Sequence, residues 1–149
     1  MKILNSVLLS VFVKGGEDES KIAEKLKTFI PVDFEKEKIA IKKTTAQGFN
    51  ESKIIILELE IKKEKHTNIF VKKIQEILSA DQKELLARQA DSRLDEEFYF
   101  FIRFDKDKLL NEYKYWVTDE GNCFHVKMNI ACFPRKREEA IKIIQNIFK

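Results

Sequence analysis

The sequence predicts an α+β fold, a mainly antiparallel sheet with helices packed on one face. Some segments alternate apolar and polar residues with the period of two that a half-buried strand requires, whereas others repeat apolar residues at the three- and four-residue spacing of an amphipathic helix. Short turns join consecutive strand segments, which favours antiparallel pairing. We expect the element order β-α-β-β-α-α-β-β-β-α, and a single domain over residues 1–149 because this length suits one hydrophobic core.

The first half of the chain is expected to form three strands and one helix. These are a strand over 3–13, a helix over 17–30, and strands over 37–43 and 53–61. Acidic residues at the start of the helix suit its positive dipole end, and Pro31 ends it. The two later strands form the clearest hairpin, because isoleucine and leucine at alternate positions of 55–61 enclose Glu58 and Glu60, after the turn-like residues 47–50.

The second half is expected to begin with two helices and to continue with three strands and a closing helix. The expected ranges are 65–78 and 80–90 for the helices, 98–104, 112–117 and 123–133 for the strands, and 135–148 for the last helix. Ser79 or Asp81 begins the second helix, with Ser79 as a candidate N-cap. The turn-like residues 119–122 join the last two strands, and Pro134 separates the final strand from the final helix.

Composition limits the classes of function. The chain has 28 basic and 25 acidic residues, and this net charge of +3 indicates nucleic-acid binding only if the cations gather on one face. No apolar run approaches the ~20 residues of a membrane span, so we expect a cytoplasmic protein without membrane contact. Cys123 and Cys132 are separated by about 30 Å of expected strand. That distance is too long for a disulfide, and we expect free thiols.

The sequence shows no signature of an enzyme, a metal site or a cofactor site. The two histidines, His66 and His125, have no local catalytic motif around them, so we interpret them as structural. The acidic run at 91–97 does not resemble a calcium loop and is interpreted as a solvated connector. Gly15-Gly16 is not followed by the Lys-Ser/Thr of a phosphate-binding loop. We therefore expect a non-catalytic protein with no cofactor and no metal.

Basic residues offer a candidate nucleic-acid interface. Arg135, Lys136 and Arg137 open a helix, where free backbone N–H groups and the helix dipole also attract phosphate. A second interpretation is a solvated helix start that Glu138 and Glu139 neutralise. The predicted RNA contacts are Arg103, Lys106, Arg135, Lys136 and Arg137, with a looser surface of Lys42, Lys43, Lys62 and Lys63. Such contacts bind the RNA backbone and give weak sequence selectivity.

The expected strand over 98–104 is aromatic on both of its sides. Tyr99, Phe101 and Arg103 occupy one side, and apolar residues at the even positions occupy the other. If the first three side chains face solvent, they form a stacking surface for unpaired bases. If helices cover that side instead, the two rings belong to the core, as aromatic residues of strands usually do. The sequence leaves both alternatives open.

Residues 93–106 have the sequence RLDEEFYFFIRFDK. This segment resembles an archaeal RNA-binding family described as predicted exosome subunits, in which an acidic turn leads into an aromatic strand that ends in R-F-D-K. The resemblance extends to the turn Gly48-Phe49-Asn50 and to the break Pro134-Arg135-Lys136. It implies a fold like that of the ribosomal protein that holds 5S ribosomal RNA. It also implies a non-catalytic, RNA-binding role near RNA processing or ribosome assembly, with exosome or ribosomal components as further partners.

The chain departs from this family pattern at two places. Asp107-Lys108-Leu109 and Asn111 stand where the family has Gln-Ala-Ala and a later glycine, and Asn50-Glu51 stands where it has Asn-Pro. The alternative function is a protein-interaction or assembly module whose charges serve only solubility. A contiguous positive face in the folded protein would favour RNA, whereas an even mixture of charges would favour this alternative.

Overall fold

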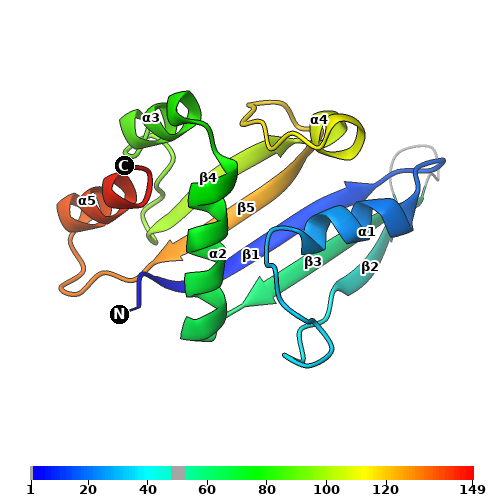
Figure 1. The fold of residues 1–149 in the computed structure, drawn as a ribbon, viewed down its shortest axis with the longest axis horizontal. Coiled ribbons are helices and arrows are strands. Elements are labelled where there is room, and N and C mark those ends of the chain that lie inside the picture. Colours follow the sequence, from blue (N-terminus) through cyan, green and yellow to red (C-terminus); the bar gives the residue numbers. More distant parts are fainter. Residues whose placement is uncertain (1, 48–52) are drawn as a thin grey trace.

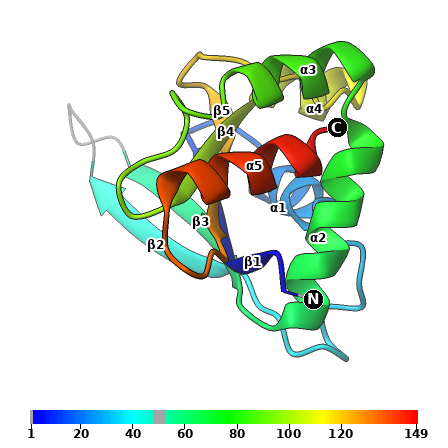
Figure 2. The same ribbon diagram turned by 90° about the vertical axis from the view of Figure 1, so that its left-hand side faces the viewer.

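The computed structural model describes residues 2–47 and 53–149. Within these residues, five strands form one antiparallel sheet in the order β2-β3-β1-β5-β4, and the helices gather on one side of it (Figures 1 and 2). The strands are β1 (Leu4–Val13), β2 (Lys42–Gln47), β3 (Lys53–Ile61), β4 (Tyr99–Asp105) and β5 (Cys123–Ile130). The helices are α1 (Glu19–Lys27), α2 (Glu64–Ile77), α3 (Ala80–Arg88), α4 (Lys106–Glu112) and α5 (Arg137–Ile147). The predicted α+β class is confirmed.

The first strand of the chain is the central strand of the sheet. β1 pairs with β3 on one side and with β5 on the other, so that Leu9 lies opposite both Leu59 and Val126. β2 pairs with the outer side of β3, as the predicted hairpin requires. Of the turn expected at residues 47–50, residues 48–50 lie outside the described residues. β4 lies at the opposite edge of the sheet, beside β5.

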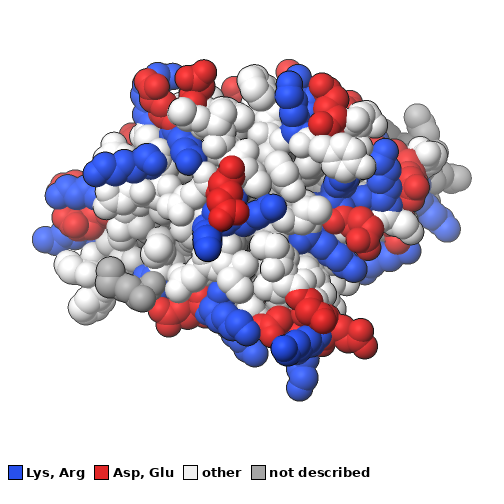
Figure 3. Space-filling model, viewed as in Figure 1, with Lys and Arg blue, Asp and Glu red and all other residues white. Residues whose placement is uncertain are grey.

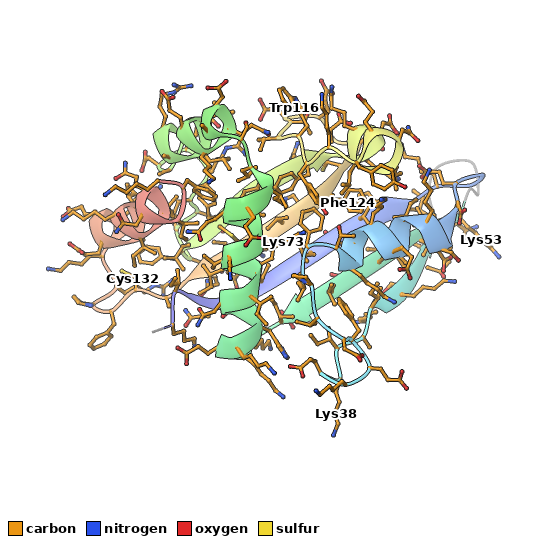
Figure 4. All side chains as sticks on the ribbon, in the orientation of Figure 1. Lys38, Lys53, Lys73, Trp116, Phe124 and Cys132 are labelled. Atoms are coloured by element: carbon orange, nitrogen blue, oxygen red, sulfur yellow. The ribbon has the colours of Figure 1, made fainter. Side chains whose placement is uncertain are left out.

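The core lies between the sheet and the helices, and alternate residues of each strand point into it. Phe100, Ile102 and Phe104 of β4 are fully buried there, as is Phe124 of β5, which lies on the helix side of its strand (Figure 4). Phe29, just after α1, packs against Phe104 and Phe124 with ring centroids 5.3 and 6.0 Å apart. The intervening residues of β4 and β5 therefore point to the opposite side of the sheet. No helix of the described residues covers that side (Figure 2).

The structure differs from the expectation at residues 112–117, which do not form a strand. Residue 112 instead ends α4, residues 113–116 lie in a loop, and Val117 makes an isolated bridge with Phe104. The side chain of Asp105 begins α4 by accepting a hydrogen bond from the backbone N–H of Lys108 at 2.9 Å. Tyr113 ends the helix in a left-handed conformation with φ of 55°. This left-handed backbone of Tyr113 interrupts the extended conformation that the expected strand requires.

Strand β2 begins at Lys42 instead of at residue 37. The preceding segment folds into hydrogen-bonded turns around Asp33, whose backbone oxygen accepts from Glu37 N at 2.9 Å and whose side chain accepts from Lys36 N at 3.1 Å. Local side-chain bonds of this kind compete with extended structure. Lys38, with φ of 57°, cannot continue a strand.

Two further expectations concern the membrane and the thiols. Among the described residues, none of the helices combines the length and the apolar character that crossing a bilayer demands. Cys123 and Cys132 are both free thiols. β5 ends at Ile130, so Cys132 lies beyond the strand on which it was expected.

Candidate nucleic-acid interface

The side of the sheet that faces away from the helices is here termed the open face. β4 and β5 contribute these side chains to it: Tyr99, Phe101, Arg103, Asp105, Cys123, His125, Lys127 and Asn129. Phe101 lies opposite Lys127, and Arg103 lies opposite His125. Of the two alternatives for the aromatic strand, the structure therefore shows the one in which Tyr99 and Phe101 lie outside the core. Both rings are half-buried by their neighbours on the open face.

Aromatic rings and cations alternate along this part of the open face. The Nζ atom of Lys127 lies 4.2 Å from the ring centroid of Tyr99 and 5.9 Å from that of Phe101. Phe101 also stacks on His125, with the ring centroids 5.6 Å apart and the planes at 30°. Arg103 is exposed next to His125 and donates a hydrogen bond from Nη1 to the backbone oxygen of Asp119 at 2.9 Å. Two cations and three rings thus form one continuous row.

Burial and the neighbouring cations disfavour the charged form of His125. Burial lowers the pKa of His125 from its usual value, and the positive charges of Arg103 and Lys127 lower it further. Burial raises the pKa of the neighbouring Cys123 thiol, although the nearby cations act against this increase. The positive charge of the row therefore comes from Arg103 and Lys127.

Loops protect the outer edge of β4 and fix the row in place. The backbone N–H of Phe101 donates to Arg93 O at 3.0 Å, and Thr118 N donates to Arg103 O at 2.9 Å. Arg93 also donates from Nη1 to Phe101 O at 3.2 Å. Because these bonds occupy the hydrogen-bonding groups of the edge, β4 is not free to pair with another strand.

Two hollows lie at the two ends of the row. One, of about 470 Å³, is lined by Tyr99 and Asn129 together with Glu97, Phe98 and Arg135. The other, of about 310 Å³, is lined by Arg103 and His125 together with Ser10, Phe12, Gly121 and Cys123. The row therefore connects two concave surfaces that each contain an arginine.

Lys106 is among the predicted RNA contacts, but the structure buries it. Its Nζ donates to the backbone oxygen of Phe12 at 2.6 Å and to Oε1 of Glu17 at 2.8 Å, and the residue is 1% exposed. Burial raises the pKa of Glu17, but the hydrogen bonds that it accepts from Lys106 and from the backbone of Lys14 outweigh this effect and lower the pKa overall. A contact from Lys106 to a phosphate is incompatible with this geometry, and we exclude it from the interface.

Arg137 is occupied by the chain itself. Its guanidinium donates to Asp91 Oδ1 at 2.9 Å, to the backbone oxygens of Asp91 and Leu94 at 2.8 Å each, and to that of Asp95 at 3.3 Å. The arginine thus fastens α5 to the acidic segment that precedes β4. This segment is ordered by internal bonds rather than being only a solvated connector, because the Asp95 carboxylate also accepts from Tyr99 N at 2.9 Å.

Arg135 and Lys136 remain exposed beside the row. The guanidinium of Arg135 lies 4.9 Å from the ring centroid of Phe98, the residue just before β4, and lines the larger hollow with Tyr99. Lys136 occupies the N-cap position of α5 and makes no side-chain capping bond. The structure therefore brings Arg135 and Arg103 to opposite ends of β4.

The four remaining predicted lysines lie away from β4 and β5. Lys42 is on the open face of β2, opposite Glu58, and four strand spacings separate it from β4, about 19 Å. Lys43 pairs with Glu19 of α1 at 3.0 Å, and Lys62 lies 3.6 Å from Glu60. Lys63 is exposed at the N-cap of α2. The structure does not gather these lysines with the arginines into one patch.

Sequence reasoning missed His125 and Lys127 as site residues. The sequence shows no motif around His125, which is therefore interpreted as structural, and it gives no signal that singles out Lys127. Only the pairing of β5 with β4 shows that Lys127 and His125 lie beside the aromatic rings. On the helix-covered side, basic and acidic side chains lie intermingled over the helices, without a contiguous positive area (Figure 3).

Comparisons with known proteins bear on this geometry. A family model described as RNA binding matches residues 6–130. An RNA-binding protein of Pyrococcus abyssi is 27% identical over 142 residues, which cover 95% of this chain and 91% of that protein. An uncharacterized protein of Methanocaldococcus jannaschii is 32% identical over 145 residues, which cover 95% of each chain.

Solved structures of similar proteins have the same fold. The crystal structure of a protein of Archaeoglobus fulgidus, of the DUF54 family, superposes with a TM-score of 0.83 at 27% identity and covers 97% of this chain and 99% of that one. A DUF54 protein of Methanothermobacter thermautotrophicus superposes with a TM-score of 0.79 at 26% identity and covers 99% of this chain and 100% of that one. The family model spans most of the chain, including all of the row on β4 and β5. The chain therefore belongs to the RNA-binding family.

Proposed function

We propose that this protein is a non-catalytic RNA-binding protein, that residues 1–149 act as one RNA-binding domain, and that the open face of β4 and β5 is the contact surface. The main observation in support is the row of rings and cations on two neighbouring strands of the open face. From Tyr99 to Arg103 and from His125 to Asn129, none of the side chains on this face is acidic. A polyanion that lies along this stretch thus meets positive charge and aromatic surface, and the carboxylates of Asp105 and Glu97 lie beyond its two ends.

The phosphate contacts are assigned to the exposed cations of the row and its ends. Arg103 and Lys127 lie within it, and Arg135 and Lys136 lie at the end near Tyr99. Arginine suits this role because its planar guanidinium binds phosphate through two parallel hydrogen bonds. Lys42 and Lys63 add a looser positive surface at a distance.

A salt series tests the proposal. Binding of a labelled random-sequence RNA pool is measured by fluorescence anisotropy over increasing KCl for the wild type and for the double variant Arg103→Gln/Lys127→Gln. The double variant is expected to flatten the slope of log K against log salt by about 1.4 units, because each lost phosphate contact on a single strand removes about 0.7. The control is Lys72→Gln, which removes a positive charge from the exposed side of α2. No RNA binding at low salt, or an unchanged slope in the double variant, would contradict the proposal.

The family resemblance extends the proposal to RNA processing or ribosome assembly, with exosome or ribosomal components as partners. Co-sedimentation of the tagged protein with these particles from an archaeal extract tests this extension. If the protein sediments with neither particle but still binds RNA, it acts as an RNA-binding protein outside these particles.

A protein-interaction module is the second candidate function. It is favoured by the intermingled charges in Figure 3 and by apolar side chains on the β1 and β3 part of the open face, where Phe12 is 53% exposed. It predicts that the wild type captures a specific protein partner in a pull-down without being retained on RNA, and that Phe12→Ser abolishes this capture.

A further inference from the structure

The open face of β4 and β5 has a geometry that distinguishes unpaired from paired nucleotides. Tyr99 and Phe101 lie two residues apart on the same side of β4, so their attachment points are separated by about 7 Å along the strand. Stacked nucleotides advance by about 3.4 Å along one strand of a duplex. Bases that rest on successive rings of β4 must therefore be splayed apart, and a base can be splayed only if it is not paired.

Lys127 covers the ring of Tyr99 in the free protein and can move away from it when a phosphate binds. In the free protein, the Lys127 ammonium lies 4.2 Å from the Tyr99 centroid, where it is attracted by the ring. A phosphate attracts the same ammonium more strongly because it carries a full negative charge. Movement of Lys127 to a phosphate would expose the face of Tyr99 to the adjacent base.

His125 supplies a polar edge at the other end of the row. Its ring stacks on Phe101, and within the part of the chain that the structure describes no protein group bonds to its ring nitrogens. His125 lines the hollow of about 310 Å³, together with Ser10 and Arg103. A neutral imidazole has one donor and one acceptor nitrogen, which matches the edge of a base that has left its stack.

We infer that the open face of β4 and β5 takes a short stretch of unpaired RNA, whose bases stack on Tyr99 and Phe101 and whose next base enters the hollow beside His125. The inference rests on the proposed function and specifies its ligand. The strand runs along β4 between Arg135 and Arg103, and its phosphates contact these arginines and Lys127. The row accommodates about two to three bases, as other antiparallel sheets with paired aromatic residues do. A duplex cannot use this surface, because pairing and stacking hide the faces of its bases.

Competition binding tests the inference with the full chain. A labelled short single-stranded RNA is displaced by the same unlabelled strand or by its blunt duplex, for the wild type and for Tyr99→Leu and Phe101→Leu. Leucine keeps an apolar side chain on the half-buried face but removes the stacking plane. Trp116→Leu is the matched control, because Trp116 is 45% exposed and has Lys108 Nζ 5.4 Å from its centroid, but lies outside the row (Figure 4).

We expect the single strand to compete strongly and the duplex weakly. Each leucine variant should weaken single-strand binding about tenfold, the effect of losing one base–aromatic stack, while the salt slope and the control variant remain unchanged. Equal competition by the duplex, or unaltered single-strand binding in both leucine variants, would overturn the inference and leave the proposed function in place. Absence of binding to either RNA would overturn the proposed function itself.

Ultraviolet cross-linking of the wild type provides a readout that does not depend on how the variants fold. A uridine-containing single strand should cross-link to the peptide that contains residues 99–103. Cross-links confined to the helix-covered side would overturn the assignment of the bases to the open face.

Discussion

Substitution of Lys106 tests whether this lysine stabilises the fold or contacts RNA. Lys106→Met keeps most of the buried side chain but removes the ammonium, which leaves Glu17 and the Phe12 carbonyl without their donor. Removal of one partner of a buried ion pair costs about 3–5 kcal/mol. The Glu17 side chain is 29% exposed and regains part of its hydration, so we expect the lower value, about 3 kcal/mol. In a chain of this length, that loss lowers Tm by about 9 °C.

Urea unfolding followed by circular dichroism measures this change in the free energy of unfolding. The double variant Lys106→Met/Glu17→Gln should regain part of the loss, because no buried charge then lacks a partner. The salt slope of RNA binding should be the same in Lys106→Met as in the wild type. A destabilisation below about 1 kcal/mol would refute the argument from burial, since even a single buried hydrogen bond to a charge is worth about 1.5 kcal/mol or more. A flattened salt slope would instead place Lys106 in the interface.

Two other predictions concern stability. Arg137→Lys should lower the free energy of unfolding in urea by about 2 kcal/mol, because one ammonium cannot replace the guanidinium bonds to Asp91, Leu94 and Asp95; unchanged unfolding would show that the fastening of α5 is dispensable. The hydrogen bonds from Lys65 and His66 lower the pKa of Glu37 from its usual value of 4.5 to about 2. The ionised carboxylate therefore stabilises the fold at pH values above 4.5, and this stability is lost as the pH falls towards 2. Glu37→Gln should therefore be less stable than the wild type near neutral pH and lose less stability between those two pH values, and parallel acid-unfolding curves would contradict this.

Local sequence patterns were sufficient for most elements of the fold. The alternation of residues 53–61 gave β3 at the same bounds, and the serine expected to cap α3 accepts a hydrogen bond from Gln82 N at 3.3 Å. The expected strand over 112–117 had a similar alternation but lies in a loop. There, α4 extends to Glu112 and Tyr113 follows in a left-handed conformation, which a strand cannot contain.

The candidate site was less accessible to sequence reasoning. β4 has aromatic residues on both sides, so periodicity alone could not decide which side faces the core. The structure decides it through distant partners, because Phe100 packs on Phe148 with ring centroids 5.7 Å apart and Phe104 packs on Phe29. Tyr99 and Phe101 remain on the other side as a consequence.

The sequence by itself determined the α+β class, the main elements and the abundance of surface charge, because these depend on the spacing of neighbouring residues. Only the tertiary structure decided which cations are available to a ligand. Lys106 and Arg103 are equally basic in the sequence, yet one is neutralised by Glu17 and the other remains exposed beside His125. The difference arises because burial and ion pairing depend on residues that are far apart in the chain and meet only when the sheet is assembled.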